Sequence, residues 1–192
     1  MQGGRCDTRV GILSDTHGSV AAWQAAFRGP LRDADLLLHA GDFLYHGPRN
    51  PLPQGYDPKA LAGLINSSSA PILAARGNCD ADIDQVLIDW PLQAPYALAQ
   101  VDGIRLMLSH GHEKSEEERL ALAKRYRVHI WITGHTHVPA LCEQQGVVLL
   151  NPGSPALPKG DPAVPTVAWL DTEARRARVV SLDGEPLLEL TF

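Results

Sequence analysis

Short apolar runs alternate with polar loops and amphipathic segments along the first half of the chain. The run Arg9–Ser14 predicts a buried strand, and Ser19 can cap a helix that ends near Gly29-Pro30. The run Asp35–His39 predicts a second strand, and the Asp57-Pro58 pair indicates the start of a second helix. The first half of the chain therefore predicts strands that alternate with helices.

The middle of the chain continues this pattern and adds a hairpin. Pro71–Ala75 predicts a third strand, and two apolar runs, Tyr96–Val101 and Ile104–Ser109, flank the strong hairpin signal Asp102-Gly103. A capping box follows, in which Ser115 precedes Glu118 by three residues, and it predicts a helix before a further strand over Val128–Thr133.

The last third of the chain predicts short strands with tight connections, which indicates antiparallel pairing. These strands are expected at Val147–Leu150, Thr166–Leu170, Arg178–Leu182 and Leu187–Leu190. Because each sheet must bury one face against another layer, we expect an α/β (α+β) fold: a four-layer αββα sandwich of two stacked mixed sheets flanked by helices. Residues 1–192 would form a single domain, with residues 1–8 as a flexible N-terminal extension.

Composition narrows the class of protein. The chain has 192 residues, of which 44% are hydrophobic and 20% charged, as is ordinary for a globular domain. No apolar run is long enough for a membrane span or resembles a signal peptide, so we expect no membrane contact and a cytoplasmic protein. A net charge of −5 disfavours long nucleic acids as partners. The three cysteines, Cys6, Cys79 and Cys142, are too scattered for a disulfide framework.

Residues that bind hard or borderline metal ions occur where predicted strands give way to glycine-containing loops. Parallel strands bring their carboxyl ends to one edge of a sheet, so these side chains can meet there. Carboxylate, amide and imidazole groups without thiolate favour two six-coordinate divalent ions, most readily Mn²⁺, with Fe, Zn, Co or Ni able to compete. The candidate metal ligands are Asp15, His17, Asp42, Asn78, His110, His135 and His137.

The order of the motifs resembles the calcineurin-like metallophosphoesterase superfamily. The motifs are Asp-x-His at Asp15, Gly-Asp at Asp42, Gly-Asn-Cys-Asp at Asn78, His-Gly-His at His110 and Gly-His-Thr-His at His135. Within that superfamily the chain is similar to the small, uncapped YfcE-like phosphodiesterases. The resemblance extends to the segments 46–50 and 151–154 and covers the chain from Arg9 onward.

This resemblance implies one ion held by Asp15, His17, Asp42 and His137, and a second held by Asp42, Asn78, His110 and His135. Asp42 would bridge the two ions. The implied activity is hydrolysis of small phosphodiesters by a hydroxide that bridges the ions, without a phosphoenzyme. The residues expected to act in catalysis are Asn78, Cys79 and His110.

The roles of several further residues allow two interpretations. Cys79 stands where a histidine often occurs in the wider superfamily; it either donates a proton to the leaving group, and so touches substrate, or merely fills space. His112 is a candidate neighbour of the ligands or of the substrate, and Arg49 is either a phosphate-binding or a solvated loop residue. His39 and His129 fit better as histidines satisfied within the core.

Two other functions remain open at this stage. The same fold serves as a protein-interaction scaffold in the retromer coat, where the metal pocket is degraded; all seven ligand positions are intact here, which favours an enzyme. A phosphomonoesterase or a nuclease of the same superfamily is the alternative within enzymes. The natural substrate cannot be read from the sequence, and homo-oligomerisation is compatible with it.

Overall fold

The computed structural model describes residues 8–192, so nearly all of the predicted N-terminal extension lies outside the described residues. Within this range the helices are α1 (Val20–Arg28), α2 (Pro58–Asn66), α3 (Asp82–Leu87) and α4 (Glu116–Tyr126). The strands are β1 (Arg9–Leu13), β2 (Leu36–His39), β3 (Ile72–Ala75), β4 (Leu92–Gln93), β5 (Ala97–Val101), β6 (Ile104–Leu108), β7 (Ile130–Ile132), β8 (Ala140–Gln144), β9 (Val147–Asn151), β10 (Thr166–Asp171), β11 (Arg176–Ser181) and β12 (Pro186–Thr191).

The strands form two mixed sheets. The larger sheet has the order β12-β11-β10-β1-β2-β3-β4, in which β1 to β4 run parallel and β10 to β12 are antiparallel. The smaller sheet has the order β5-β6-β7-β9-β8, with β6, β7 and β9 parallel at its centre. The segments that contain the predicted metal ligands follow parallel strands of the two sheets. These segments therefore lie at the carboxyl ends of the strands.

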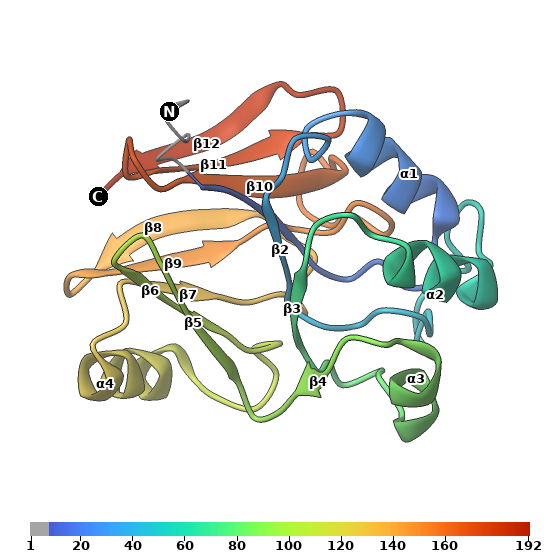
Figure 1. The fold of residues 1–192 in the computed structure, drawn as a ribbon, viewed down its shortest axis with the longest axis horizontal. Helices are drawn as coiled ribbons and strands as arrows, with labels where there is room; N and C mark the ends of the chain where they lie inside the picture. The colour runs from blue at the N-terminus through green and yellow to red at the C-terminus, as the bar shows by residue number, and fades with distance from the viewer. Residues whose placement is uncertain (1–7) are drawn as a thin grey trace, which may run out of the picture.

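Three apolar clusters define four layers. The inner faces of the two sheets pack together through residues such as Ile12, Leu106 and Val179. Helices α1, α2 and α3 lie on the outer side of the larger sheet, and α4 lies on the outer side of the smaller one (Figure 1). The predicted αββα sandwich of two mixed sheets is confirmed.

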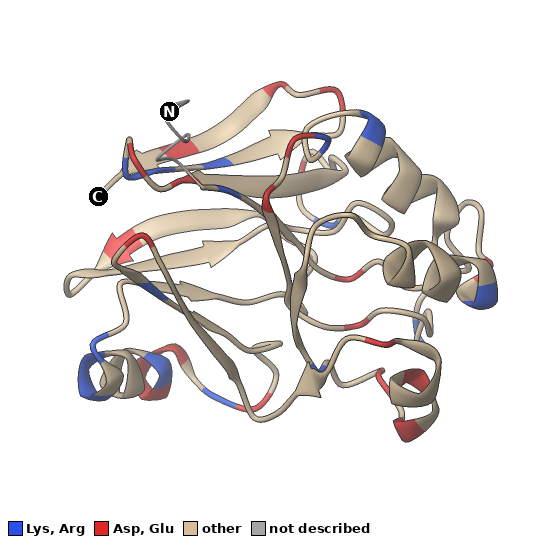
Figure 2. Cartoon of the chain, in the orientation of Figure 1, with Lys and Arg blue, Asp and Glu red and all other residues tan. Residues whose placement is uncertain are grey.

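Local signals account for where the helices begin. Ser19 accepts a hydrogen bond from the Ala22 N–H at the start of α1, and Asp57 caps α2 in the same way. Ser115 and Glu118 form the predicted capping box of α4. This helix has glutamates in its first turn and basic residues in its last turn (Figure 2), which suits the helix dipole.

The tail of the chain differs from the expectation in one respect. β10, β11 and β12 are antiparallel as predicted, but β9 pairs parallel with β7. Along the chain β8 comes between β7 and β9, and it pairs antiparallel with β9 at the edge of the sheet, so β9 enters beside β7 in the same direction as β7. No helix within residues 8–192 combines the length and the apolar character needed to cross a bilayer.

Candidate metal centre

The candidate ligands lie in loops at the carboxyl ends of parallel strands. Asp15 and His17 follow β1, Asp42 follows β2, Asn78 follows β3, His110 follows β6, and the His135–His137 turn follows β7. Nine non-glycine residues within residues 8–192 have a positive φ, and five of them are Asp15, His17, Asp42, His135 and His137. A left-handed backbone conformation costs a non-glycine residue free energy, and such residues cluster at functional sites, so this concentration is a second indication of a site here.

Two glycines allow the ligand loops to approach one another. A Cβ on Gly77 would collide with the Asp42 side chain, and a Cβ on Gly134 would collide with Ser14 and lie 2.6 Å from Asp15 Oδ2. Only glycine therefore lets the loops after β3 and β7 contact the carboxylates that follow β2 and β1.

Asp15, His17 and His137 form the first compact group. His137 Nε2 lies 3.2 Å and His17 Nε2 3.6 Å from Asp15 Oδ1, and the two Nε2 atoms are 3.1 Å apart. Asp42 Oδ2 lies 3.8 Å from His17 Nε2. All four side chains are buried, and the potential ligand atoms of Asp15, His17 and His137 all lie within 4.8 Å of one another.

A second group forms around His110. Its Nε2 lies 3.2 Å from Asp42 Oδ2 and 3.9 Å from Asp15 Oδ1, so both carboxylates face both groups. The His135 ring centroid is 5.1 Å from that of His110, in an edge-on arrangement, and His135 is partly exposed. Asn78 is exposed, and its Nδ2 points toward Cys79 Sγ at 3.3 Å. His135 and Asn78 thus border the buried group rather than belonging to it.

Backbone contacts fix which ring nitrogen of each buried histidine is available. The Nδ1 atoms of His17, His110 and His137 lie 2.7, 2.7 and 2.6 Å from the carbonyl oxygens of Tyr45, Ala40 and Leu157. A carbonyl only accepts, so each Nδ1 carries a proton and donates it, which leaves each Nε2 as a lone pair in the neutral ring. This is the tautomer that a metal ligand requires.

The donor set fits a cation. Asp15 Oδ1 and His110 Nε2 are buried without a hydrogen-bond partner among the described residues, and the Nε2 lone pairs of His17 and His137 face each other at 3.1 Å. Buried polar atoms without partners are costly, and divalent ions bound among these groups would satisfy them.

The charges of this centre depend on one another. Burial tends to raise the pKa of Asp15, but contacts with His137 and His17 outweigh it and hold that pKa well below its usual range. Burial tends to lower the pKa of His110, but Asp42 and Asp15 outweigh it and raise the pKa to about 9. Without metal, protons neutralise part of the carboxylate charge, and a bound cation must displace them.

Asp80 holds two of the ligand loops together, a role that the sequence analysis did not assign. This buried carboxylate accepts hydrogen bonds from the backbone N–H groups of Asp42 at 2.9 Å, Phe43 at 2.7 Å and Gly77 at 2.6 Å. Its place in the Gly-Asn-Cys-Asp motif was the available signal, because an aspartate two residues after a ligand lies close enough to bond the neighbouring loop.

The Asn151–Ser154 turn supports the opposite side of the centre. Asn151 Nδ2 donates to the Gly134 carbonyl at 2.8 Å and to Thr136 Oγ1 at 3.0 Å, while the Ser154 hydroxyl donates to the Asp15 carbonyl at 2.8 Å. The turn therefore fixes the backbone that carries three candidate ligands.

The remaining histidines differ in burial and in their contacts. His39 is fully buried, accepts from the Gly41 N–H, contacts Thr16 Oγ1 and stacks on Phe43, as expected of a satisfied core histidine. The same expectation is wrong for His129, which is exposed at the amino end of β7, just before the strand begins. His112 is exposed, with its ring centroid 5.4 Å from His110 and 5.9 Å from His135.

Cys79 lies beside the carboxylates. Its N–H donates to Asp42 Oδ1 at 2.8 Å, and its thiol is close to Asp42 and His17. Burial together with the charge of Asp42 raises the pKa of the thiol to about 12. The thiol is therefore protonated at neutral pH in the absence of metal.

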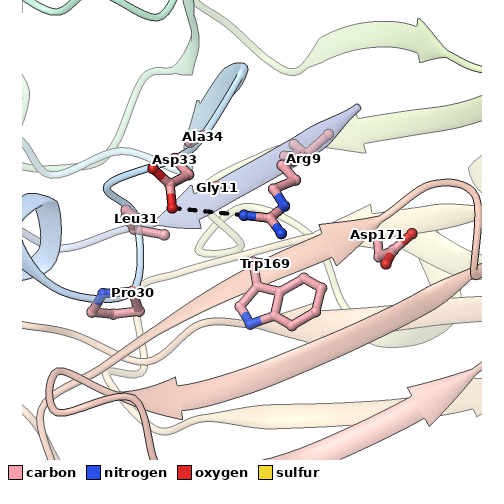
Figure 3. A pocket seen from close by; sticks show the side chains of 9 residues that line it. Arg9, Gly11, Pro30, Leu31, Asp33, Ala34, Trp169 and Asp171 are labelled. Atoms are coloured by element: carbon pink, nitrogen blue, oxygen red, sulfur yellow. Dashed lines mark ion pairs between the residues drawn. The ribbon is translucent and has the colours of Figure 1, made fainter. Parts of the chain in front are cut away.

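An open groove of about 850 Å³ leads to the centre. Its lining includes Asp42, Asn78, Cys79, His135 and His137, together with Tyr45, Arg49 and Lys159. A separate cavity of about 250 Å³ lies beside β1 and β10, where Arg9 pairs with Asp33 near Trp169 (Figure 3). None of the candidate ligands lines this second cavity, whereas four of them, Asp42, Asn78, His135 and His137, line the groove.

Comparison with known families defines the class of the protein. The model of the calcineurin-like phosphoesterase superfamily domain matches residues 8–175. The chain therefore belongs to this superfamily of metallophosphoesterases, and its chemistry is the hydrolysis of phosphoester bonds.

Individual relatives are consistent with this assignment. The chain is 40% identical over 180 residues to Phosphodiesterase YfcE of Escherichia coli strain K12, covering 92% of this chain and 94% of the relative. It is 30% identical over 190 residues to a probable metallophosphoesterase of Methanothermobacter thermautotrophicus, covering 95% and 98%.

Solved structures agree with the fold. The E. coli YfcE phosphoesterase superposes with a TM-score of 0.82 and 30% identity, covering 96% of this chain and 99% of that one. Vacuolar protein sorting 29 of Cryptosporidium parvum superposes with a TM-score of 0.67 but 17% identity, covering 97% and 99%, and so shares the fold alone. The comparisons thus favour the enzyme over the retromer-like scaffold.

Proposed function

We propose that this protein is a metal-dependent phosphodiesterase that acts on small phosphodiesters at a centre of two divalent ions. The observation that carries the proposal is the convergence of three Nε2 atoms, from His17, His110 and His137, on the carboxylates of Asp15 and Asp42. The similarity to a named phosphodiesterase over most of both chains supports the diester as substrate class.

We assign the ligands to two sites. The first site would use Asp15, His17 and His137, and the second would use Asn78, His110 and His135, with Asp42 shared between them. The shared role of Asp42 is supported by the position of its Oδ2, which faces both His110 and His17. Oxygen and nitrogen donors without a thiolate make Mn²⁺ the expected ion, with Fe, Zn, Co or Ni as competitors.

Bound divalent ions would supply Lewis acidity toward the phosphoryl oxygens. They would also supply the bridging hydroxide that attacks phosphorus directly. The chain holds the imidazoles in their required tautomer through backbone carbonyls and keeps the ligand loops in register through Asp80. A direct attack predicts inversion at phosphorus and no phosphohistidine.

Cys79 is the candidate proton donor to the leaving group. The thiol lies next to Asp42 and lines the groove, and its raised pKa keeps the proton in place at neutral pH. The alternative is that Cys79 only fills space. Cys79→His should change the ratio of monoester to diester turnover, and an unchanged ratio would favour the space-filling role.

The proposed function is tested with metal-stripped protein, Mn²⁺ and bis-p-nitrophenyl phosphate. We expect turnover to appear with metal, and Asp42→Asn to lose both metal binding and turnover. Asp82→Asn is the matched control, because the Asp82 side chain is 95% exposed and pairs with Arg76 away from the candidate ligands. If metal-loaded protein cleaves no phosphodiester, or if Asp42→Asn stays fully active, the proposal is wrong.

A further inference from the structure

Two basic side chains line the groove next to the candidate metal centre. Arg49 comes from the loop after β2 and Lys159 from the loop between β9 and β10, and both are exposed. Within residues 8–192 neither forms an ion pair, whereas Arg76 and Arg178 both pair with carboxylates. Among the described residues that line the groove, Asp42 is the one acidic side chain, and it is a candidate ligand.

Both basic residues belong to loops that are hydrogen-bonded to histidines of the first site. The Tyr45 carbonyl, four residues before Arg49, accepts from His17 Nδ1 at 2.7 Å. The Lys159 N–H donates to the His137 carbonyl at 3.1 Å, and the Leu157 carbonyl accepts from His137 Nδ1 at 2.6 Å. The positions of Arg49 and Lys159 are therefore fixed relative to the side of the centre formed by His17 and His137.

The loop of Arg49 is also anchored at its far end. The Ser19 hydroxyl donates to the Gln54 carbonyl, the Val20 N–H donates to the Gly55 carbonyl, and Ser19 forms a bridge with Tyr56. A loop held at both ends loses little further conformational freedom when its side chain binds a ligand, which favours a binding role.

The charge of these residues exceeds what a simple diester needs. A phosphodiester carries one negative charge, which the ions of the proposed centre would already meet. The chain as a whole has a net charge of −5, so the two unpaired cations make the groove locally positive on a protein that is negative overall. Exposed cations at the mouth of a groove attract a second anionic group of the substrate.

We propose that the preferred substrate is a phosphodiester that carries an additional phosphate on one of its ester substituents, and that Arg49 and Lys159 bind this additional phosphate. The inference rests on the proposed phosphodiesterase function and names its substrate class. An exposed ion pair adds up to about fivefold to kcat/KM. Two such pairs would give a preference of up to about 25-fold over the same diester without the additional phosphate.

The test compares two esters with the same leaving group: thymidine 5′-(p-nitrophenyl phosphate) with and without a phosphate at the 3′ oxygen. We expect Mn²⁺-loaded wild-type protein to prefer the phosphorylated ester by about tenfold. In the double variant Arg49→Gln, Lys159→Gln the ratio of the two kcat/KM values should fall to near one. Because exposed charges are screened, the wild-type ratio should also decline as ionic strength rises.

Arg32→Gln is the matched control, since Arg32 is an exposed arginine outside the groove, and its ratio should remain that of the wild type. A wild-type ratio near one, or a ratio that survives in the double variant, would overturn the substrate class while diester turnover itself persists. Failure of the wild type to cleave bis-p-nitrophenyl phosphate as well would instead refute the proposed function.

Discussion

Replacing Asn151 by alanine tests whether the turn after β9 supports the metal centre. The Asn151 side chain is buried and makes three hydrogen bonds: to the Gly134 carbonyl, to Thr136 Oγ1 and from the Gly153 N–H. Thr136 is exposed and its hydroxyl oxygen also accepts from the Val138 N–H, so its loss is small. The Gly134 carbonyl and the Gly153 N–H are both buried: the carbonyl would keep its hydrogen bond from the Thr136 N–H, whereas the Gly153 N–H would lose its partner.

The expected loss of stability follows from these two groups. A buried group left without a partner costs about 1–3 kcal/mol and a hydrogen bond lost from a group that keeps another partner costs about 0.5–1.5 kcal/mol, so Asn151→Ala should lower the free energy of unfolding by about 2–4 kcal/mol. For a chain of this length that corresponds to a Tm lower by roughly 4–16 °C. Because the Gly134–His137 turn carries two candidate ligands, Mn²⁺ affinity should fall about 10- to 100-fold.

Asn66→Ala is the matched control. Asn66 also bonds backbone groups, donating to the Leu87 carbonyl and accepting from the Asp89 N–H, but both hydrogen bonds are solvent-exposed. Water can replace it, so we expect a loss of about 1 kcal/mol and no change in metal affinity. Urea unfolding in EDTA measures stability without metal, and calorimetric titration measures Mn²⁺ binding. If Asn151→Ala costs no more than Asn66→Ala, the buried hydrogen bonds do not support the turn as argued.

Three further changes probe the centre. Gly134→Ala should abolish metal binding because its Cβ would meet Asp15, whereas Gly63→Ala, with open space around its Cβ, should stabilise α2 by about 0.5–1 kcal/mol; binding by both or neither would contradict this. The Cys79 thiol of metal-free protein should react slowly with iodoacetamide at pH 8, since its pKa is raised to about 12; a rate like that of free cysteine would refute this shift. The pKa of His110 is raised to about 9, so the stability that its protonated form contributes below pH 6.5 should be lost as the pH rises to 9. Urea denaturation of metal-free protein measures this loss. A free energy of unfolding that does not decline between about pH 6.5 and 9 would contradict the raised pKa.

Much of the fold was predictable because hydrophobic runs and capping residues act locally. Strands such as β1 and β2 are buried on both faces and read as continuous apolar runs, and Asp102-Gly103 adopts the positive φ values that its hairpin turn requires. α3 was missed because its apolar residues Ile83 and Val86 face solvent, so no amphipathic pattern marks it. β8 is a largely exposed edge strand and gave an equally weak signal.

The candidate site was predictable in composition but not in geometry. The ligand types and their places after strands could be read from the sequence, since parallel strands collect their carboxyl ends at one edge. The order of burial could not: Asp15 and His110 lie deep in the centre, while Asn78 is exposed. Nor could the sequence indicate that Lys159, far along the chain, enters the groove, because this depends on a hydrogen bond between two loops.

The centre is costly to the fold unless cations occupy it. Asp15 is fully buried beside Asp42, and its Oδ1 has no hydrogen-bond partner among the described residues, so burial and like charge both oppose folding. Although burial tends to lower the pKa of His17 and of His110, the carboxylates raise it, so protons on these rings offset part of this cost. Metal binding and folding should therefore be coupled: ions that bind only the folded state stabilise it by about 2.7 kcal/mol at a hundredfold excess over Kd. The same arrangement that destabilises the metal-free chain thus preorganises it for the ions that its chemistry requires.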